Sequence, residues 1–272
     1  MNNYSSALNE TDKVEASILE EIQAGNYVIC QAKPTIVSAL CAVPRLDSAD
    51  IRLIHDCSMP PGKGVNSYIS IDEQQFQTLD DAIQVIKKGY FLAKVDLRHT
   101  YRSFPTHSSN YDGMGLKWKF SSSHTPTYLV DTRLPFGSSS SPGIFHRITQ
   151  SIRRIMKRKG FTVTAYLDDF LVAGRTSQEC ELAYKVFFKF LLDLGFELGQ
   201  HKLVPPCQAL IFLRVQIDSA QLVLTLPPEK FLSFKKEIKT FRTLKSVSKR
   251  QLQQLAGRLN WACTKVVYGG RT

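Results

Sequence analysis

The sequence lacks an apolar run that could cross a membrane, and it lacks the cysteine and histidine patterns of zinc or disulfide frameworks. No stretch of about 18 consecutive apolar residues occurs, and the polar N-terminal segment has no apolar signal core. The six cysteines lie far apart without a CxxC pair, and none of the six histidines belongs to an HExxH motif. We therefore expect an intracellular protein of the cytoplasm or nucleus, with buried thiols and no membrane partner.

The charge balance is strongly basic. Lysine and arginine number 35 against 24 aspartates and glutamates, which gives a net charge of +11 and an isoelectric point near 9.4. An excess of this size favours an anionic partner, either nucleic acid or an anionic membrane surface. The length of 272 residues suffices for a substantial core and one or two domains.

Hydrophobic spacing predicts an N-terminal helix followed by two strands. Val14, Ile18 and Ile22 lie four residues apart, as on one face of a helix. Residues 35–43 and 51–55 are predicted to be strands, and PRLDSAD between them is typical of a hairpin loop. The stretch MPPGKGVN that follows is predicted to be a loop because of its prolines and glycines.

The middle of the chain alternates strands with helices. A short helix is predicted at 79–88, and after it come strand 91–97, helix 142–158, strands 161–166 and 170–173, helix 178–194, and strands 211–217 and 221–226. We expect an α+β sheet with helices on one face. The apolar residues of helix 178–194 that are predicted to face inward are Leu182, Val186, Phe187, Phe190 and Leu194.

Two amphipathic helices are predicted after the paired prolines Pro227 and Pro228, which suggest a boundary. The second helix begins at Ser248, with Gln251 in the spacing of a capping box. The apolar stripes are Phe231, Phe234, Ile238 and Phe241 in the first helix and Leu252, Leu255, Leu259 and Ala262 in the second. The basic residues of the first helix, which are candidate phosphate contacts, are Lys235, Lys236, Lys239 and Arg242.

Two adjacent carboxylates, Asp168 and Asp169, stand at the centre of the apolar stretch TAYLDDFLVAG. Burying an unpaired carboxylate costs several kcal/mol, so the pair needs water, hydrogen-bond donors or a cation. The pair alone fits either a solvated hairpin tip, since aspartate favours turns, or a metal site. The rest of the chain decides between these two interpretations.

A third carboxylate, Asp96, ends the predicted strand 91–97. In a β-α-β-β sheet the first and third elements can lie side by side, which would bring Asp96 next to the hairpin tip. Three clustered carboxylates repel one another, and oxygen-only ligands suit Mg²⁺ or Mn²⁺. Two such ions can activate an attacking hydroxyl and stabilise a leaving pyrophosphate, as in polymerases and nucleases.

Three motifs carry a family resemblance. KVDLRHTYRSFP, LPFGSSSSPGIFHRI and AYLDDFLVAG, in this order and spacing, resemble core motifs of reverse transcriptases, closest to those of retrotransposons of the long-terminal-repeat or tyrosine-recombinase type. IRLIHDCSMPPGKGVN resembles the preceding fingers segment, GQHKLVPP and IFLRVQID the segments after the hairpin, and LQQLAGRLNWAC the helix beyond them. The resemblance covers most of residues 33–263.

The resemblance implies an α+β right-hand polymerase fold with fingers, a ferredoxin-like palm and a short helical thumb. The implied domains are fingers at 1–90 with the N-terminal helix, palm at 91–227 with part of 105–140 in the fingers, and a partial thumb or connection at 228–272. The implied activity is that of an RNA-directed DNA polymerase, a nucleotidyltransferase that adds deoxynucleotides to a primer 3′-hydroxyl on an RNA or DNA template. The implied cofactors are two Mg²⁺ or Mn²⁺ ions.

Catalytic residues are carried over by position. Asp96 and Asp168 would be the main metal ligands, Asp169 would complete the acidic cluster, and the Leu97 carbonyl would be an extra ligand. Lys202 matches a lysine that the family places near the pyrophosphate, where it would act as general acid. A lone loop lysine is also typical of a solvated surface.

Nucleotide-binding residues follow in the same way. Arg45 and Arg52 match fingers positions that hold the triphosphate, since guanidinium donates paired hydrogen bonds to phosphate. Tyr101 falls where the family places the ring that faces the sugar, and Phe136 and Gly137 would lie beside the nucleotide and templating base. Taken singly, the arginines also fit exposed surface residues, and Phe136 with Gly137 also fits an ordinary turn before a helix.

Three positions depart from the family pattern. His99 stands where an acidic residue is common, Thr100 where alanine is common, and Arg214 where the primer-contacting segment usually has glycine. None of them removes a metal ligand. They leave a second hypothesis open, in which the chain is a decayed retroelement remnant that binds nucleic acid without chemistry.

Overall fold

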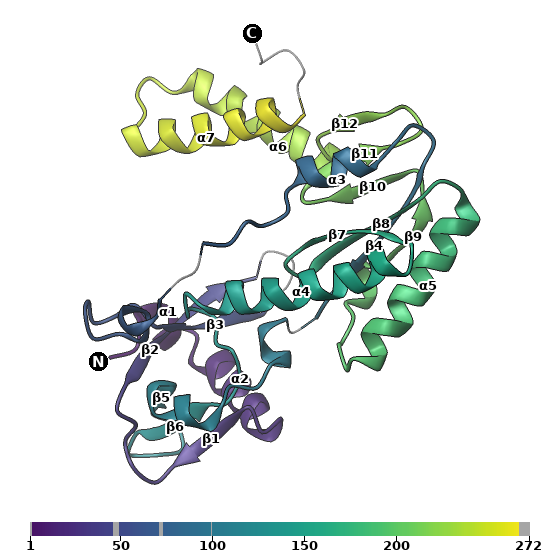
Figure 1. Ribbon diagram of the computed structural model, residues 1–272. Coiled ribbons are helices and arrows are strands. Elements are labelled where there is room, and N and C mark those ends of the chain that lie inside the picture. The colour runs from purple at the N-terminus through teal and green to yellow at the C-terminus, as the bar shows by residue number, and fades with distance from the viewer. Residues whose placement is uncertain (1, 46–48, 71–72, 99, 267–272) are drawn as a thin grey trace. The chain divides into compact units, whose positions relative to one another are not determined.

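The computed structural model describes residues 2–45, 49–70, 73–98 and 100–266 (Figure 1). The chain forms two compact units. The first consists of residues 1–75 and 99–148, and the second of residues 76–98 and 149–272. Within the described ranges, every helix is too short or too polar to span a bilayer.

The first unit is built around a five-stranded sheet with the order β1-β6-β5-β2-β3. The strands are β1 Tyr27–Cys30, β2 Val37–Pro44, β3 Ile51–Asp56, β5 Gly115–Trp118 and β6 Thr127–Asp131. The unit also contains helices α1 Ser5–Leu8 and α2 Thr11–Gln23 and the 3-10 helices η1 Val65–Tyr68, η2 Tyr101–Ser103 and η3 Ser108–Gly113. The long helix α4 Ser141–Arg158 begins in this unit. Strands β2 and β3 form the predicted hairpin.

The predicted N-terminal helix is confirmed as α2, and its apolar spacing explains where it packs. Val14 and Ile18 are fully buried against Leu40, Leu116 and other sheet residues, with Ile22 partly buried beside them. Burying an aliphatic side chain of this size stabilises the fold by about 1.5–3 kcal/mol. The helix therefore belongs to the core of the first unit.

A buried ionic network ties α2, η2 and β6 together. The Arg102 guanidinium donates to both carboxylate oxygens of Asp131, at 2.7 and 2.6 Å, and to both of Glu21, at 3.1 and 2.8 Å. It also lies over the ring of Tyr27, whose hydroxyl is 2.9 Å from His55 Nε2. Burial lowers the pKa of His55 to about 3, so the imidazole is neutral. Because every charge is paired, the network fixes η2, and with it the backbone at Tyr101.

The second unit contains a four-stranded antiparallel sheet with the order β7-β8-β4-β9 (Figure 1). Its strands are β4 Phe91–Asp96, β7 Thr162–Tyr166, β8 Asp169–Gly174 and β9 Val204–Cys207. Strand β4 pairs with β8 from Phe91 opposite Gly174 to Asp96 opposite Asp169. The expectation that the strand of Asp96 lies beside the carboxylate hairpin is therefore confirmed.

The two faces of this sheet are covered by different elements. Helix α5 Ser177–Asp193 packs on the face of Phe170, whose ring meets Phe187 at 5.0 Å. Helix α3 Leu79–Val85 packs on the opposite face, where Leu79 joins a cluster with Leu171. The expectation of helices on one face was therefore wrong for α3, which also ends three residues before the predicted Lys88.

The predicted inward face of α5 was partly wrong, because Phe187 is buried and Val186 and Phe190 are half-buried but the two leucines are exposed. Leu182 and Leu194 are 58% and 51% exposed, whereas the buried residues of the helix are Cys180, Ala183, Phe187 and Leu191. Apolar residues occur on more than one side of this helix, so spacing alone did not choose the side that meets the sheet. The side of the helix that meets the sheet is set by close packing at Gly174. A Cβ atom added at this glycine would lie 2.5 Å from the backbone nitrogen of Cys180.

A three-stranded sheet follows, with β10 Ala209–Phe212, β11 Val215–Asp218 and β12 Val223–Thr225 in that order. The strand predicted at 211–217 is in fact a hairpin, because Phe212 pairs with Val215 and leaves Leu213 and Arg214 as a two-residue loop. Both loop residues have positive φ, 45° and 68°. Two left-handed residues in a two-residue hairpin loop are typical of a type I′ turn.

The last elements are α6 Pro228–Thr243 and α7 Lys249–Lys265, with the 3-10 helix η4 Gln200–Lys202 earlier in the unit. The predicted capping box of Ser248 and Gln251 is present. Ala262 is buried as predicted, but Leu252 and Phe231 are exposed. Packing of the apolar stripes is therefore confined to part of each helix.

We expect Arg214→Gly to raise the free energy of unfolding by about 1 kcal/mol, because a left-handed backbone costs a residue with a Cβ about that much and costs glycine almost nothing. Urea denaturation would measure the change. Arg214→Ala is the matched control, since it removes the same side chain but keeps the Cβ. Equal effects of the glycine and alanine variants would contradict the explanation.

Candidate active site

The hairpin between β7 and β8 has the shortest loop that can join two antiparallel strands. Tyr166 pairs with Asp169, which leaves Leu167 and Asp168 as the loop. Leu167 has φ of 50°, a left-handed conformation that costs an L-residue about 1–2 kcal/mol. Strained residues of this kind concentrate at functional sites, where the surrounding structure enforces them. Left-handed residues also occur in the Leu213–Arg214 hairpin loop, so the Leu167 backbone supports a site only together with the side chains around it.

Three carboxylate residues lie at this end of the sheet. Asp96 is directly opposite Asp169 in the β4–β8 ladder, so the two side chains project from the same face. The Asp168 carbonyl accepts a hydrogen bond of 3.1 Å from the Leu97 backbone NH. The structure thus brings Asp96, Asp168 and Asp169 together, as the sequence predicted, and holds Leu97 beside them.

Two lysines pair with these carboxylates. Lys94 Nζ is 2.7 Å from Asp169 Oδ1, an ion pair whose geometry is not that of a directed hydrogen bond. Lys202 Nζ is 3.4 Å from Asp96 Oδ1 and 3.3 Å from Oδ2. Lys202 therefore reaches the site from η4, whereas Lys94 was not recognised in the sequence.

Asp96 is the most enclosed of the three carboxylates, with only 4% of the residue exposed. Burial raises its pKa from 3.8 to about 6, against the opposing charge of Lys202 and together with the charges of Asp169 and Asp168. Gly199 forms one wall, since a Cβ there would lie 2.9 Å from Asp96 Oδ2. Its backbone NH donates to the Asp96 carbonyl at 2.9 Å. Position 199 therefore requires glycine, because its backbone lies too close to the Asp96 carboxylate to leave room for a side chain.

The donor set fits a divalent cation in its chemistry. Carboxylate oxygens are the ligands that Mg²⁺ and Mn²⁺ prefer, and burial, with a smaller contribution from the charges of Asp169 and Asp168, raises the pKa of Asp96. Within the described part of the chain, no three His, Cys, Asp or Glu side chains are already arranged as a metal-holding group. The ammonium groups of Lys94 and Lys202 provide the positive charge beside the carboxylates in this structure.

The first unit assembles most of the predicted nucleotide-binding residues. The Arg52 guanidinium lies 5.1 Å from the centre of the Phe136 ring, and the Tyr101 ring is 5.0 Å from the same ring. Tyr101 also meets Phe145 edge-on at 5.7 Å. Arg45 is exposed at the end of the β2–β3 hairpin, two residues beyond Val43, which pairs with Arg52.

Gly137 is required by its surroundings. Its φ is 118°, and a Cβ would lie 1.8 Å from the His55 carbonyl oxygen. The His55 backbone NH donates to the Phe136 carbonyl at 2.9 Å, and Asn66 Nδ2 donates to the Gly137 carbonyl at 3.0 Å. Asn66 also accepts from the Ser139 NH at 2.8 Å. The loop MPPGKGVN, predicted only as a loop, thus supplies the residue that holds this turn.

The structure places two of the three residues that depart from the family motifs. His99 lies outside the described residues. Thr100 precedes η2 as its N-cap. Arg214 stands at the left-handed hairpin position described above, which explains why glycine is common there.

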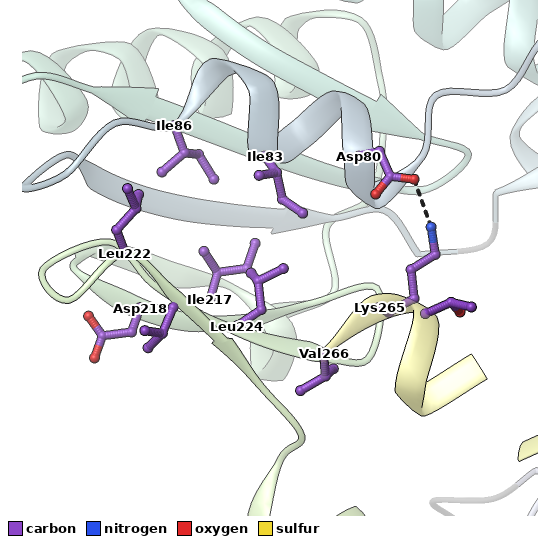
Figure 2. A pocket seen from close by; sticks show the side chains of 11 residues that line it. Asp80, Ile83, Ile86, Ile217, Asp218, Leu222, Leu224, Lys265 and Val266 are labelled. Atoms are coloured by element: carbon purple, nitrogen blue, oxygen red, sulfur yellow. Dashed lines mark hydrogen bonds and ion pairs between the residues drawn. The ribbon is translucent and has the colours of Figure 1, made fainter. Parts of the chain in front are cut away.

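A cavity of ≈ 520 Å³ lies elsewhere in the second unit, between α3, the β11–β12 hairpin and the end of α7. Figure 2 shows its apolar lining, with Ile83 and Ile86 facing Ile217 and Leu224. Lys265 forms an ion pair of 2.8 Å with Asp80 at its edge. None of its lining residues belongs to the carboxylate site, so the cavity is not part of that site.

Comparison with known proteins identifies the family whose motifs the sequence contains. A family model described as reverse transcriptase (RNA-dependent DNA polymerase) matches residues 55–217. Protein P of hepatitis B virus, genotype B/C subtype adw, is 29% identical over 87 residues, which make up 31% of this chain and 10% of that protein.

Solved structures show a similar fold. The foamy viral protease-reverse transcriptase in complex with double-stranded DNA has a TM-score of 0.75 at 20% identity, over 96% of this chain and 41% of that chain. A foamy viral protease-reverse transcriptase in complex with an RNA/DNA hybrid has a TM-score of 0.72 at 20% identity, over 96% of this chain and 32% of that chain. The native prototype foamy virus protease-reverse transcriptase has a TM-score of 0.65 at 17% identity, over 99% of this chain and 36% of that chain. The α+β fold predicted from the sequence, a right-hand polymerase fold, is confirmed.

We expect the free energy of unfolding, measured with a chelator present, to fall by about 2 kcal/mol as pH rises from about 4 to 6 because of Asp96. Its pKa is about 6 in the folded chain and ordinarily 3.8, so the folded chain binds more protons in that interval. Urea denaturation across this range would show the loss in wild type and not in Asp96→Asn. Asp193→Asn, which removes an exposed carboxylate of α5, serves as control and should follow wild type. Parallel pH profiles for wild type and Asp96→Asn would contradict the assignment.

Proposed function

Because the chain belongs to the reverse transcriptase (RNA-dependent DNA polymerase) family, we propose that it adds deoxynucleotides to a primer 3′-hydroxyl on an RNA or DNA template. The observation that carries the proposal is the β4–β8 register, which sets Asp96 opposite Asp169 beside the Leu167–Asp168 loop. The chain spans 41% of the first foamy viral structure and 10% of the viral Protein P, so the proposal concerns this chain alone.

The proposed chemistry follows from the carboxylates. Asp96 and Asp168, with the Leu97 carbonyl as an extra ligand, would be the main ligands of two Mg²⁺ or Mn²⁺ ions, and Asp169 would complete the acidic cluster. When bound, such ions activate the primer hydroxyl and stabilise the leaving pyrophosphate. Lys202 would donate a proton to the pyrophosphate, as the motif resemblance implies, and its exposed side chain, with only a long contact to Asp96, is accessible for that role. Enclosure of Asp96 limits the water that competes for its oxygens.

The proposed nucleotide contacts come from the first unit. Arg52 and Arg45 would bind the triphosphate by charge-assisted hydrogen bonds. Phe136 and Gly137 would lie beside the nucleotide and templating base, in a turn that Asn66 and His55 hold. Tyr101 would face the sugar, with its ring supported by Phe136. The Arg102 network would keep the backbone of this ring in place.

We further propose that the chain comes from a retrotransposon of the long-terminal-repeat or tyrosine-recombinase type, on the motif resemblance. Its fingers, palm and partial thumb would correspond to residues 1–90, 91–227 and 228–272, with part of 105–140 in the fingers. A primer–template partner is supported by the basic charge and by the nucleic-acid complexes in which the structural neighbours were solved.

A remnant that binds nucleic acid without chemistry is the second candidate. It is favoured by the two ion pairs, Lys94 with Asp169 and Lys202 with Asp96, which engage the carboxylates that the metal ions would need. It predicts binding to primer–template with strong salt dependence and no primer extension in Mg²⁺ or Mn²⁺.

Primer extension on poly-rA/oligo-dT with Mg²⁺ or Mn²⁺ separates the two candidates. We expect extension by the wild-type chain and its loss in Asp168→Asn, because the remaining carboxylates supply too few oxygen ligands for two ions. Asp193→Asn is the matched control, since it changes an exposed carboxylate of α5 and should leave the rate unaltered. Asp168→Asn activity within a few-fold of wild type, in a variant with unchanged circular dichroism, would refute the catalytic assignment.

Tyr101→Val tests selection against ribonucleotides. A ring at this position would clash with a ribose 2′-hydroxyl and stack on deoxyribose, so its removal should lower the deoxyribonucleotide to ribonucleotide incorporation ratio by about 10²-fold or more. Single-nucleotide incorporation rates would give the ratio, and the increase should come from faster ribonucleotide use. Tyr101→Phe keeps the ring and should keep the ratio. If both substrates slow equally in Tyr101→Val, the ring only packs against Phe136 and Phe145.

A further inference from the structure

Lys94 lies two residues before Asp96 on β4, so the two side chains project from the same face of the sheet. In the β4–β8 ladder Asp96 is opposite Asp169, and Lys94 is opposite Leu171. Lys94 is therefore the diagonal neighbour of Asp169, a distance that a long side chain spans. Its Nζ reaches Asp169 Oδ1 at 2.7 Å.

The surroundings of Lys94 make this ion pair persistent. Strand β4 is central, and Lys94 pairs with Leu171 on β8 and with Val204 on β9. Leu92, Leu171 and Val204 belong to one apolar cluster, so the lysine stem lies at its border and the ammonium points to the acidic end. Only 15% of the Lys94 side chain is exposed. An ammonium enclosed to this degree is stable only with a partner, and the partner is Asp169.

The second lysine is held differently. The Lys202 side chain is 56% exposed, comes from a 3-10 helix and contacts Asp96 at 3.3 Å or more. The Lys202 ammonium is solvated and its contact to Asp96 is long, so a cation that enters the site can displace Lys202 and take its place as the partner of the buried carboxylate. The carboxylates thus differ in availability. Asp96 is released easily, whereas Asp169 stays engaged by a lysine from the neighbouring strand.

On the basis of the proposed function, we propose that Lys94 is a positioning residue that holds Asp169 and neutralises its charge, leaving Asp96 and Asp168 as the carboxylates that bind the divalent ions. Asp169 then shapes the site without taking a metal ion as its main partner. The pair also sets the net charge of the site, and therefore how tightly divalent ions bind. Loss of Lys94 frees a third carboxylate, which adds an oxygen ligand and binds the ions too tightly and in a different arrangement.

Binding of Mn²⁺ alone to the full 272-residue chain, followed by electron paramagnetic resonance of free Mn²⁺, tests this assignment without substrate. We expect Lys94→Met to bind Mn²⁺ at least about tenfold more tightly. Lys94→Arg should remain near wild type. Lys189→Met, which removes a lysine paired with Asp193 on α5, controls for net charge and should leave Mn²⁺ affinity unchanged. Lys94→Gln, which keeps the length and a hydrogen-bond donor, replaces the methionine variant if that variant does not fold.

The decisive comparison uses Asp169→Asn. If Lys94 acts through Asp169, Lys94→Met should tighten Mn²⁺ binding less than about threefold in the Asp169→Asn background. The same factor in both backgrounds would overturn the proposal, because Lys94 would then act only as a nearby charge. In primer extension, kcat should fall about 10–100-fold in Lys94→Met, with KM for the nucleotide unchanged and with recovery in Lys94→Arg.

Different results would refute the role of Lys94 and the polymerase activity. Normal primer extension together with Mn²⁺ affinity that ignores Lys94 would overturn the role of Lys94 and leave the proposed function intact. Absence of extension in wild type, together with Mn²⁺ affinity that depends on Lys94 only when Asp169 is present, would overturn the proposed function and uphold the positioning role.

Discussion

The register of β4 against β8 is the constraint on which the site depends. Side chains alternate between faces along a strand, so a slip by one residue would move Asp96 away from Asp169 to the other face of the sheet. Two features fix the position of the hairpin that carries Asp168 and Asp169. The two-residue loop Leu167–Asp168 permits one pairing of β7 with β8, and Phe170 is committed to the Phe187 ring on α5. The strained Leu167 backbone is thus tolerated because packing on both sides of the hairpin determines it.

The two units deal with buried charge in opposite ways. In the first, Arg102 satisfies Asp131 and Glu21 with four hydrogen bonds, and the resulting cluster has no capacity left for a ligand. In the second, Asp96 has only a long contact to an exposed lysine, and burial raises its pKa to about 6. A fully paired cluster fixes structure, whereas an underpaired one is available for chemistry. Burial of charge is therefore common to both clusters, and incomplete pairing is what distinguishes the candidate site from the structural cluster.

Much of the fold and of the carboxylate site could be predicted because their signals are local. The β4 strand, the hairpin and the adjacent helices follow from periodicity, and Asp96, Asp168 and Asp169 lie in short motifs. Lys94 was missed because its role depends on a diagonal contact, which exists only once the register is known. The exposure of Leu182 on α5 was missed for a similar reason, since Leu182 and Phe187 are both strongly apolar and only contact with the sheet discriminates between them.

Glycine positions show why one departure from the family pattern is tolerated. At Gly137 a Cβ would overlap the His55 carbonyl at 1.8 Å, and at Gly199 it would crowd the Asp96 carboxylate at 2.9 Å, so a side chain at either position must displace the site itself. Arg214 also occupies a left-handed position, but its side chain is exposed at a hairpin tip. It therefore carries only the intrinsic backbone cost, about 1–2 kcal/mol, without a clash. A side chain is excluded where glycine makes room for a neighbouring group. It is tolerated where glycine is favoured only by the left-handed backbone of a turn.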